Sequence, residues 1–136
     1  MTWEPRPVPP VTPETEVFWS AAADGALLLG HCADCGTVFY YPRAHCPDCF
    51  GADVSLEPAA GTGTIYSYTV AHRSESVPEE DLPVVIAYVE LDEGPRLISN
   101  VLGCDPADVE IGDAVAVDFV ETEADEVGVP VFRLTA

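Results

Sequence analysis

Four of the chain's five cysteines form two identically spaced pairs, Cys32-Ala-Asp-Cys35 and Cys46-Pro-Asp-Cys49, with ten residues between the pairs. Two residues between paired cysteines let one tight turn direct both sulfurs to the same point, and two such turns complete a tetrahedral shell of thiolates. The pattern predicts one zinc ion per chain. A closed shell leaves no position for water or substrate, so the predicted zinc is structural and not catalytic.

The sequence gives less support to other chemical roles for these thiols. Two disulfides would need an oxidising compartment, and the start, Met1-Thr2-Trp3-Glu4-Pro5, lacks the basic and then apolar pattern of a secretory signal. Iron in a rubredoxin-like site stays open as an alternative. Thioredoxin-type exchange uses one pair at a helix start. His31 and His45 each adjoin a ligand cysteine and could replace one, although four cysteines already complete the shell.

The remaining candidates for chemistry do not form a catalytic set. Cys104 would need a base and a thiolate-favouring site to act as a nucleophile, and its acidic neighbours oppose both, so we predict a semi-buried structural residue. His72-Arg73 is either a ligand-phosphate contact or a solvated strand end. The acidic residues are many and lie in predicted loops, so none is singled out as a general acid. We predict no catalytic residue.

The charge is strongly negative, with 24 acidic residues, five arginines and a net charge of −19. Such self-repulsion opposes compactness. In salt near 1 M the Debye length falls to about 3 Å, which removes most of the repulsion. We interpret the acidity as adaptation to a salty cytoplasm, with an ordinary acidic subunit as the alternative. The arginines are scattered along the chain, which disfavours a nucleic-acid phosphate backbone as the partner.

Length and hydropathy indicate a small protein outside the membrane. The 136 residues suit one compact domain with a small satellite. Apolar runs stay short of the roughly 18 residues that indicate a membrane span. Together with the start of the chain, this makes a cytoplasmic location the expectation.

The first half of the chain predicts an arm, a helix and a zinc ribbon. Prolines make residues 1–12 an extended arm, and a helix should begin with Thr12 as its cap and end at Asp24-Gly25. It carries Phe18 and Trp19, which either pack on the chain's own ribbon or dock on a partner. Short strands at 26–30 and 38–41 alternate with the two cysteine turns, and Gly36 should take a positive φ.

The second half predicts a barrel. After the bend at 61–64, strands are expected at 65–72, 84–91, 96–102, 114–120 and 128–134, with a helical turn at 105–108. Tyr66, Tyr68 and Val70 should share one face of the first strand. This order matches an OB-fold barrel, with an antiparallel sandwich as the alternative. The predicted fold class is therefore mainly β: an N-terminal arm and helix (1–25), a rubredoxin-like zinc ribbon (26–58) and a C-terminal OB-fold domain (59–136).

The order of motifs resembles a known family. It runs from Phe18-Trp19 through both cysteine pairs and Tyr41-Pro42-Arg43, and continues with Gly61-x-Gly63, Tyr66-Ser67-Tyr68-Thr69, Pro83, Leu91-x-x-Gly94 and Ile111-Gly112-Asp113-x-Val115. This resembles the zinc-ribbon-plus-OB-fold family of acyl-CoA-associated proteins, accessory partners of thiolase-fold enzymes. Two departures stand out. Many members read Pro-Pro-Arg where Tyr41-Pro42-Arg43 stands, and many carry an aromatic residue near Leu56-Glu57.

The resemblance implies a non-catalytic accessory or scaffold subunit. Its partner would be an acetoacetyl-CoA thiolase, a hydroxymethylglutaryl-CoA synthase or a thiolase-like aldolase, which carries the catalytic residues in a hetero-oligomer. The OB half would help to bind or channel CoA or acyl-CoA at a shared site. Because the chain has no lysine, the phosphates would be met by the partner, by Arg73 or Arg96, or by backbone amides.

The same reasoning predicts the contact residues. An exposed aromatic surface of Phe18, Trp19, Phe39, Tyr40 and Tyr41 should dock the partner, because a ribbon of this size cannot readily bury so many rings. Tyr66, Tyr68 and Arg73 should lie toward the ligand. The competing hypotheses are a single-stranded nucleic-acid-binding ribbon and OB module that uses Tyr66 and Tyr68 for stacking, and a free-standing enzyme.

Overall fold

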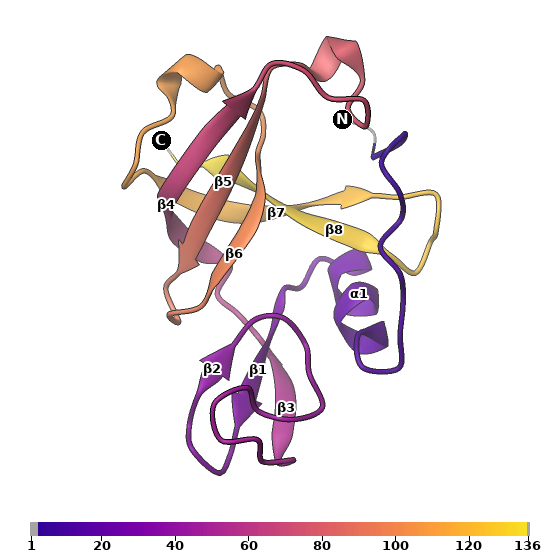
Figure 1. Cartoon of the computed structure of the whole chain (residues 1–136), viewed down its shortest axis with the longest axis vertical. Coiled ribbons are helices and arrows are strands. Elements are labelled where there is room, and N and C mark those ends of the chain that lie inside the picture. The colour runs from indigo at the N-terminus through magenta and orange to yellow at the C-terminus, as the bar shows by residue number, and fades with distance from the viewer. Residues whose placement is uncertain (1–2, 136) are drawn as a thin grey trace.

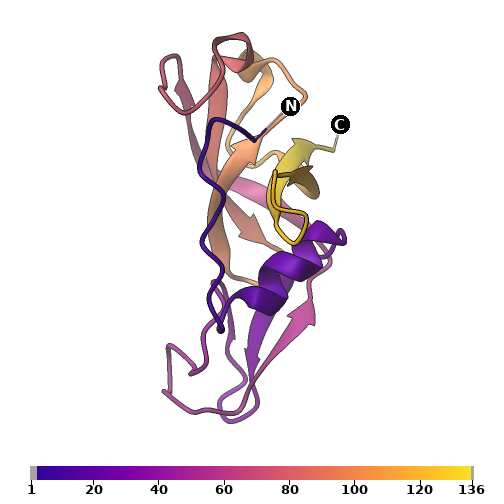
Figure 2. The ribbon, with the colours of Figure 1, turned by 90° about the vertical axis from the view of Figure 1, so that its right-hand side faces the viewer.

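The computed structural model describes residues 3–135, so Met1, Thr2 and Ala136 lie outside the described residues. The chain forms a zinc ribbon at one end and a barrel at the other, with helix α1 (Glu16–Ala23) beside both (Figure 1). The extended N-terminal segment runs along the side of the barrel, as Figure 2 shows from a second direction. Among residues 3–135, no helix is long and apolar enough to cross a membrane.

Helix α1 begins later than the sequence predicts. Thr12 and Thr15 instead form a turn, in which the Thr12 carbonyl accepts hydrogen bonds from the N–H groups of Thr15 and Glu16. Glu14, expected inside the helix, accepts a hydrogen bond of 2.6 Å from the Ala44 N–H of the ribbon. This contact is long-range, so capping patterns alone could not show it. The predicted helix end is confirmed, and it closes with the paired hydrogen bonds of a Schellman motif at Gly25 and Ala26.

The ribbon is a three-stranded antiparallel sheet in the order β2-β1-β3. Strand β1 (Leu28–Cys32) lies between β2 (Val38–Phe39) and β3 (Val54–Pro58). The sequence analysis missed β3, although Val54-Ser55-Leu56-Glu57 alternates apolar and polar residues, and this strand pairs with β1 over five residues. Ribbon strands therefore lie on both sides of β1, which is buried at four of its five positions.

The barrel is closed, with the strand order β4-β5-β6-β8-β7. Its strands are β4 (Thr62–Ala71), β5 (Val84–Leu91), β6 (Arg96–Val101), β7 (Ala114–Glu121) and β8 (Gly128–Leu134). Strand β7 closes on β4, and β6 meets β8 in parallel through Val101 and Phe132. With the 3₁₀ turn Pro106–Asp108 between β6 and β7, this confirms the predicted OB-fold, and the sandwich alternative is wrong.

One apolar core runs through helix, ribbon and barrel. Strand β5 shows the alternation clearly, because Val85, Ala87, Val89 and Leu91 are buried while the residues between them point outward. Phe18, Trp19 and Leu27–Leu29 belong to the same buried cluster. Helix α1 packs closely on β8, since a Cβ at Gly128 would stand 2.7 Å from the Ala22 carbonyl oxygen. The helix therefore joins the two sheets.

Candidate functional site

The four paired cysteines converge on one point at the end of the ribbon. The sulfurs of Cys32 and Cys49 lie 3.6 Å apart, as do those of Cys35 and Cys46, and all four lie within 4.8 Å of one another. Zinc–sulfur bonds of about 2.3 Å place tetrahedral ligands about 3.8 Å apart, whereas a disulfide bond is about 2.05 Å. The geometry fits one structural zinc ion held by four thiolates.

The two turns that carry these cysteines are built alike. The Gly36 N–H donates to the Cys32 carbonyl, and the Phe50 N–H donates to the Cys46 carbonyl, each at 2.9 Å. Both residues have positive φ, 77° at Gly36 and 62° at Phe50. The prediction for Gly36 is confirmed. Phe50 was missed, because a bulky residue rarely adopts this conformation and nothing in its side chain signals it.

Hydrogen bonds around the sulfurs tune their ionisation. Hydrogen bonds with the side chain and backbone of Thr37 lower the pKa of Cys35 to about 7. The Gly51 N–H lowers the pKa of Cys49, but the neighbouring thiols of Cys32 and Cys35 outweigh it and raise that pKa to about 12. Four sulfurs this close resist joint ionisation. When bound, a divalent cation supplies the charge that keeps all four as thiolates.

The two histidines beside the ligands lie outside this set. Among the described residues, the ligand atoms that lie within 4.8 Å of one another are the four cysteine sulfurs, and no histidine nitrogen belongs to this group. His31 Nδ1 lies 3.5 Å from Glu57 Oε2, on the ribbon sheet. His45 is exposed. The four cysteines therefore complete the shell without help.

The predicted exposed aromatic surface is wrong. Phe18 is fully buried and Trp19 is only 6% exposed, while Phe39 is buried and Tyr40 and Tyr41 are half-buried. The Phe18 ring lies 4.9 to 5.8 Å from the rings of Trp19, Tyr40 and Tyr41, and Trp19 Nε1–H donates to the Tyr41 hydroxyl. The physical reason is that the rings are shared by helix, ribbon and barrel, so the ribbon does not have to bury them alone.

Tyr66 and Tyr68 do not share a face. A bulge between Ile65 and Ser67 shifts the register of β4 against β5. Tyr68 then stands opposite Ala87, whose side chain is buried, whereas the Tyr66 ring lies 5.9 Å from Tyr88 on the outer side. Directly opposite residues of an antiparallel pair point to the same side of the sheet. The expectation that Tyr66 aligns with Tyr68 and Val70 is therefore wrong.

One face of the Tyr66 ring is covered by the Arg96 side chain. The Arg96 guanidinium lies over the ring, 3.8 Å from its centroid, and Arg96 Nε–H donates to Glu90 Oε2 at 2.8 Å. A nucleic-acid base stacking on that ring face would have to displace this pair. Tyr66 is therefore part of the sheet surface, and its ring is not an open platform for stacking a base.

Arg73 follows β4 in the loop 72–83 and is exposed. It lines a groove of about 580 Å³ with His72 and Glu79. It also lines a second groove of about 400 Å³, formed where the N-terminal segment crosses the barrel, together with Trp3 and Arg6. Arg6 stacks over the Trp3 ring at 4.9 Å and is only 9% exposed. Sequence reasoning missed Arg6, because its approach to Arg73 depends on the tertiary path of the arm.

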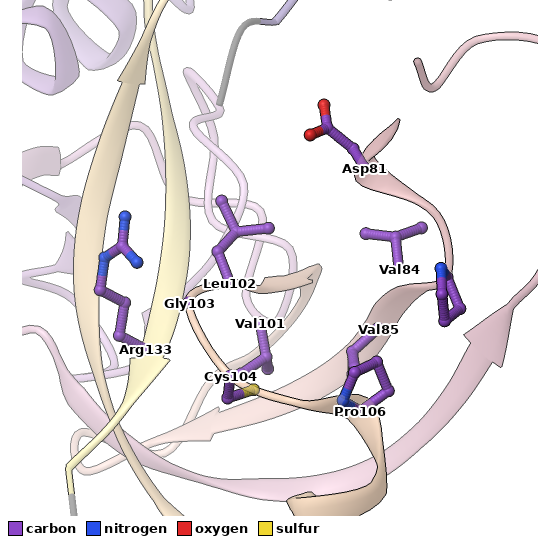
Figure 3. A pocket seen from close by; sticks show the side chains of 10 residues that line it. Asp81, Val84, Val85, Val101, Leu102, Gly103, Cys104, Pro106 and Arg133 are labelled. Atoms are coloured by element: carbon purple, nitrogen blue, oxygen red, sulfur yellow. The ribbon is translucent and has the colours of Figure 1, made fainter. Parts of the chain in front are cut away.

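Cys104 lines a pocket of about 260 Å³ at the end of the barrel (Figure 3). Asp81 and Arg133 stand on opposite walls of this pocket. Burial raises the pKa of the Cys104 thiol, and the carboxylates of Asp108, Asp105 and Asp113 raise it further. The residue is partly buried and its thiol stays protonated at neutral pH, as the sequence analysis predicts for a structural cysteine.

Comparison with known proteins matches both halves of the chain. Residues 19–55 match the family model described as the rubredoxin-like zinc ribbon domain of ChsH2, and residues 56–120 match that of the ChsH2 C-terminal OB-fold domain. A solved structure titled "Ltp2-ChsH2(DUF35) aldolase" superposes with a TM-score of 0.82 and 38% identity, and covers 94% of this chain and 99% of that one.

Curated relatives agree. A protein of Methanothermobacter thermautotrophicus described as a "DUF35 domain-containing scaffold protein" is 39% identical over 78% of this chain and 81% of its own length. A "probable enoyl-CoA hydratase alpha subunit" of Thermomonospora curvata is 40% identical over 94% of this chain. The chain spans only 40% of the length of that second relative.

Proposed function

Because this chain belongs to the DUF35 family of ChsH2-type zinc-ribbon and OB-fold proteins, we propose that it is a non-catalytic scaffold subunit of a thiolase-fold acyl-CoA enzyme. The observation that carries the proposal is its likeness, over nearly its whole length, to a solved chain whose title is "Ltp2-ChsH2(DUF35) aldolase". An acetoacetyl-CoA thiolase, a hydroxymethylglutaryl-CoA synthase and a thiolase-like aldolase are the candidate partners.

The chemistry of the chain supports a role without catalysis. The zinc shell consists of four thiolates and offers no position for a reacting ligand. The partly buried Cys104 carries a raised pKa, so it is a poor nucleophile at neutral pH. In this proposal the partner supplies the reacting groups, and this chain contributes assembly and part of the binding site.

The proposed ligand contact is a CoA or acyl-CoA site shared with the partner. Arg6 and Arg73 line one groove beside the barrel, whose other walls include Val77, Ile86 and Ile98. Two arginines can meet part of the phosphate charge of CoA, and apolar side chains can meet its pantetheine or acyl portion. With a net charge of −19, this chain needs further cations from the partner to hold the phosphates.

The test begins with purification of the tagged chain from its own host and identification of the co-purifying proteins by mass spectrometry. The thiolase-fold protein found there is then expressed with and without this chain, and its activity is measured. We expect a stable complex and an activity that depends on the chain. A chain that runs alone, with an enzyme fully active without it, refutes the proposal.

The ligand contact has its own variants. Arg73→Ala should raise the KM for the CoA substrate without weakening the complex, because Arg73 is an exposed residue of the groove wall. Arg43→Ala, at an arginine that is also exposed but lies on the ribbon, is the matched control and should leave KM unchanged. Equal KM values for the two variants would refute the contact and leave the scaffold role in place.

A further inference from the structure

We infer that the outer face of strands β4, β5 and β6 is the surface on which the partner enzyme docks, and that the partner's own surface there has an apolar centre with basic residues at both ends. This rests on the proposed function and adds where the partner sits. The outer sheet face consists of Tyr66, Ile86, Tyr88 and Ile98, which are 48%, 37%, 38% and 71% exposed. The described part of the chain has nine exposed large hydrophobic residues, and these four share one surface.

The four side chains form a continuous patch. Tyr88 of β5 stands directly opposite Ile98 of β6, and the Tyr66 ring meets the Tyr88 ring edge to face at 5.9 Å. Ile86 lies two residues before Tyr88 on the same side of β5. The three strands run side by side in Figure 1. The other exposed hydrophobic residues belong to other elements or to the inner side of β4, so they do not extend the patch.

The patch also has a recess. Ile86 and Ile98 line the groove of about 400 Å³ beneath the N-terminal segment. The patch therefore borders the groove proposed for the shared ligand, and contiguous exposed apolar surface marks interaction sites. Because the barrel is closed, a partner cannot add a strand to it and has to engage side chains.

The charged residues around this face indicate the kind of partner that it binds. Strand β5 leads at both ends into acidic segments, and their exposed members are Glu75, Glu79 and Glu80 before it and Asp92 after it. The arginines near the face are Arg96, which pairs with Glu90 at 2.8 Å, Arg73 in the loop before β5, and Arg6, which lines the same groove as Ile86 and Ile98 and is only 9% exposed. Electrostatic complementarity therefore favours a surface with basic residues at the two ends of an apolar centre.

The same charge argues against other occupants. A second copy of this chain would add another net charge of −19 to the complex. Nucleic acid would bring phosphates to the same acidic ends. A protein surface with basic residues around an apolar centre is the occupant that the patch accommodates.

The test uses the thiolase-fold protein identified in the native complex and measures its Kd for purified variants by titration calorimetry. Ile98→Asp places a charge at the centre of the face and should weaken binding about tenfold or more. Ile111→Asp is the matched control, because Ile111 is 68% exposed and precedes β7 outside the face. It should bind within about twofold of the wild type. Unchanged zinc content and Tm show that both variants fold.

A second pair of measurements tests the charge. The double variant Glu79→Lys, Glu80→Lys should slow association and weaken its dependence on salt, without changing the zinc content.

Equal binding of Ile98→Asp and the wild type overturns the docking surface and leaves the scaffold role standing. A wild-type chain that binds no partner overturns both. Self-association that Ile98→Asp abolishes shows the occupant to be a second copy, and also overturns the inference.

Discussion

The burial of Phe18 leads to a sharp stability prediction. The side chain is 0% exposed and packs against three aromatic rings at centroid distances of 4.9, 5.5 and 5.8 Å. Replacing a buried phenylalanine with alanine removes its transfer free energy and leaves a cavity, at a cost of about 3–5 kcal/mol. Aromatic pairs add about 0.5–1.5 kcal/mol each beyond area, so we place Phe18→Ala near the upper end of that range.

This loss would be a large fraction of the total stability. Domains unfold with a free energy of about 5–15 kcal/mol, and each kcal/mol shifts the Tm of a chain this size by about 3–6 °C. Phe18→Ala should therefore lower Tm by roughly 15–30 °C. Phe18→Leu, which keeps most of the apolar volume but loses the ring contacts, should cost less than Phe18→Ala and remain measurable if the alanine variant does not fold.

The assay is urea unfolding with zinc held at a fixed saturating concentration, followed by tryptophan fluorescence and circular dichroism. Val17→Ala is the control, because Val17 belongs to the same helix and is 59% exposed. It should change the free energy of unfolding by less than about 0.5 kcal/mol. A Phe18→Ala variant within about 1 kcal/mol of wild type would refute the shared core and restore the exposed aromatic surface.

Four further predictions follow from the site and the charge. Metal analysis should find one zinc per chain, and Cys32→Ser or Cys49→Ser should lose it and unfold the ribbon; protein without zinc or iron and with thiols oxidised in pairs would contradict this. Tm should climb steeply from low to molar KCl as screening relieves the −19 charge, and a flat curve would make the acidity incidental. Single-stranded DNA or RNA should bind negligibly at physiological salt, and micromolar binding with a salt slope would refute this. The hydrogen bond from Arg133 lowers the pKa of Asp118, so this pair stabilises the fold above the unfolded value of about 3.9 and loses that effect as pH falls through the lower folded value. Because both side chains are about half exposed, Asp118→Asn should cost at most about 1 kcal/mol at pH 7 and less at pH 2, as measured by urea unfolding at both pH values; an equal loss at both would refute the assignment.

The sequence by itself determined the features that depend on neighbouring residues. The spacing of Cys32, Cys35, Cys46 and Cys49 was enough to predict the zinc shell, because two tight turns bring the sulfurs together locally. Alternation and turn residues placed β5 and β8 at the bounds that the structure shows. The capped turn Pro106–Asp108 followed from Asp105, whose side chain accepts from the Ala107 N–H.

Tertiary structure decided what lies inside and what faces out. Phe18 and Trp19 suit either an interface or a core, and they became core because β8 and the ribbon meet on the same helix. The short alternation Val54-Ser55-Leu56-Glu57 permits a strand, but only the open edge of β1 decides that β3 pairs there. One bulged residue turned Tyr66 away from Tyr68, since the side-chain period of a strand is two and a single inserted residue reverses the faces. Long-range pairing sets these outcomes, and a pattern along the chain carries no record of it.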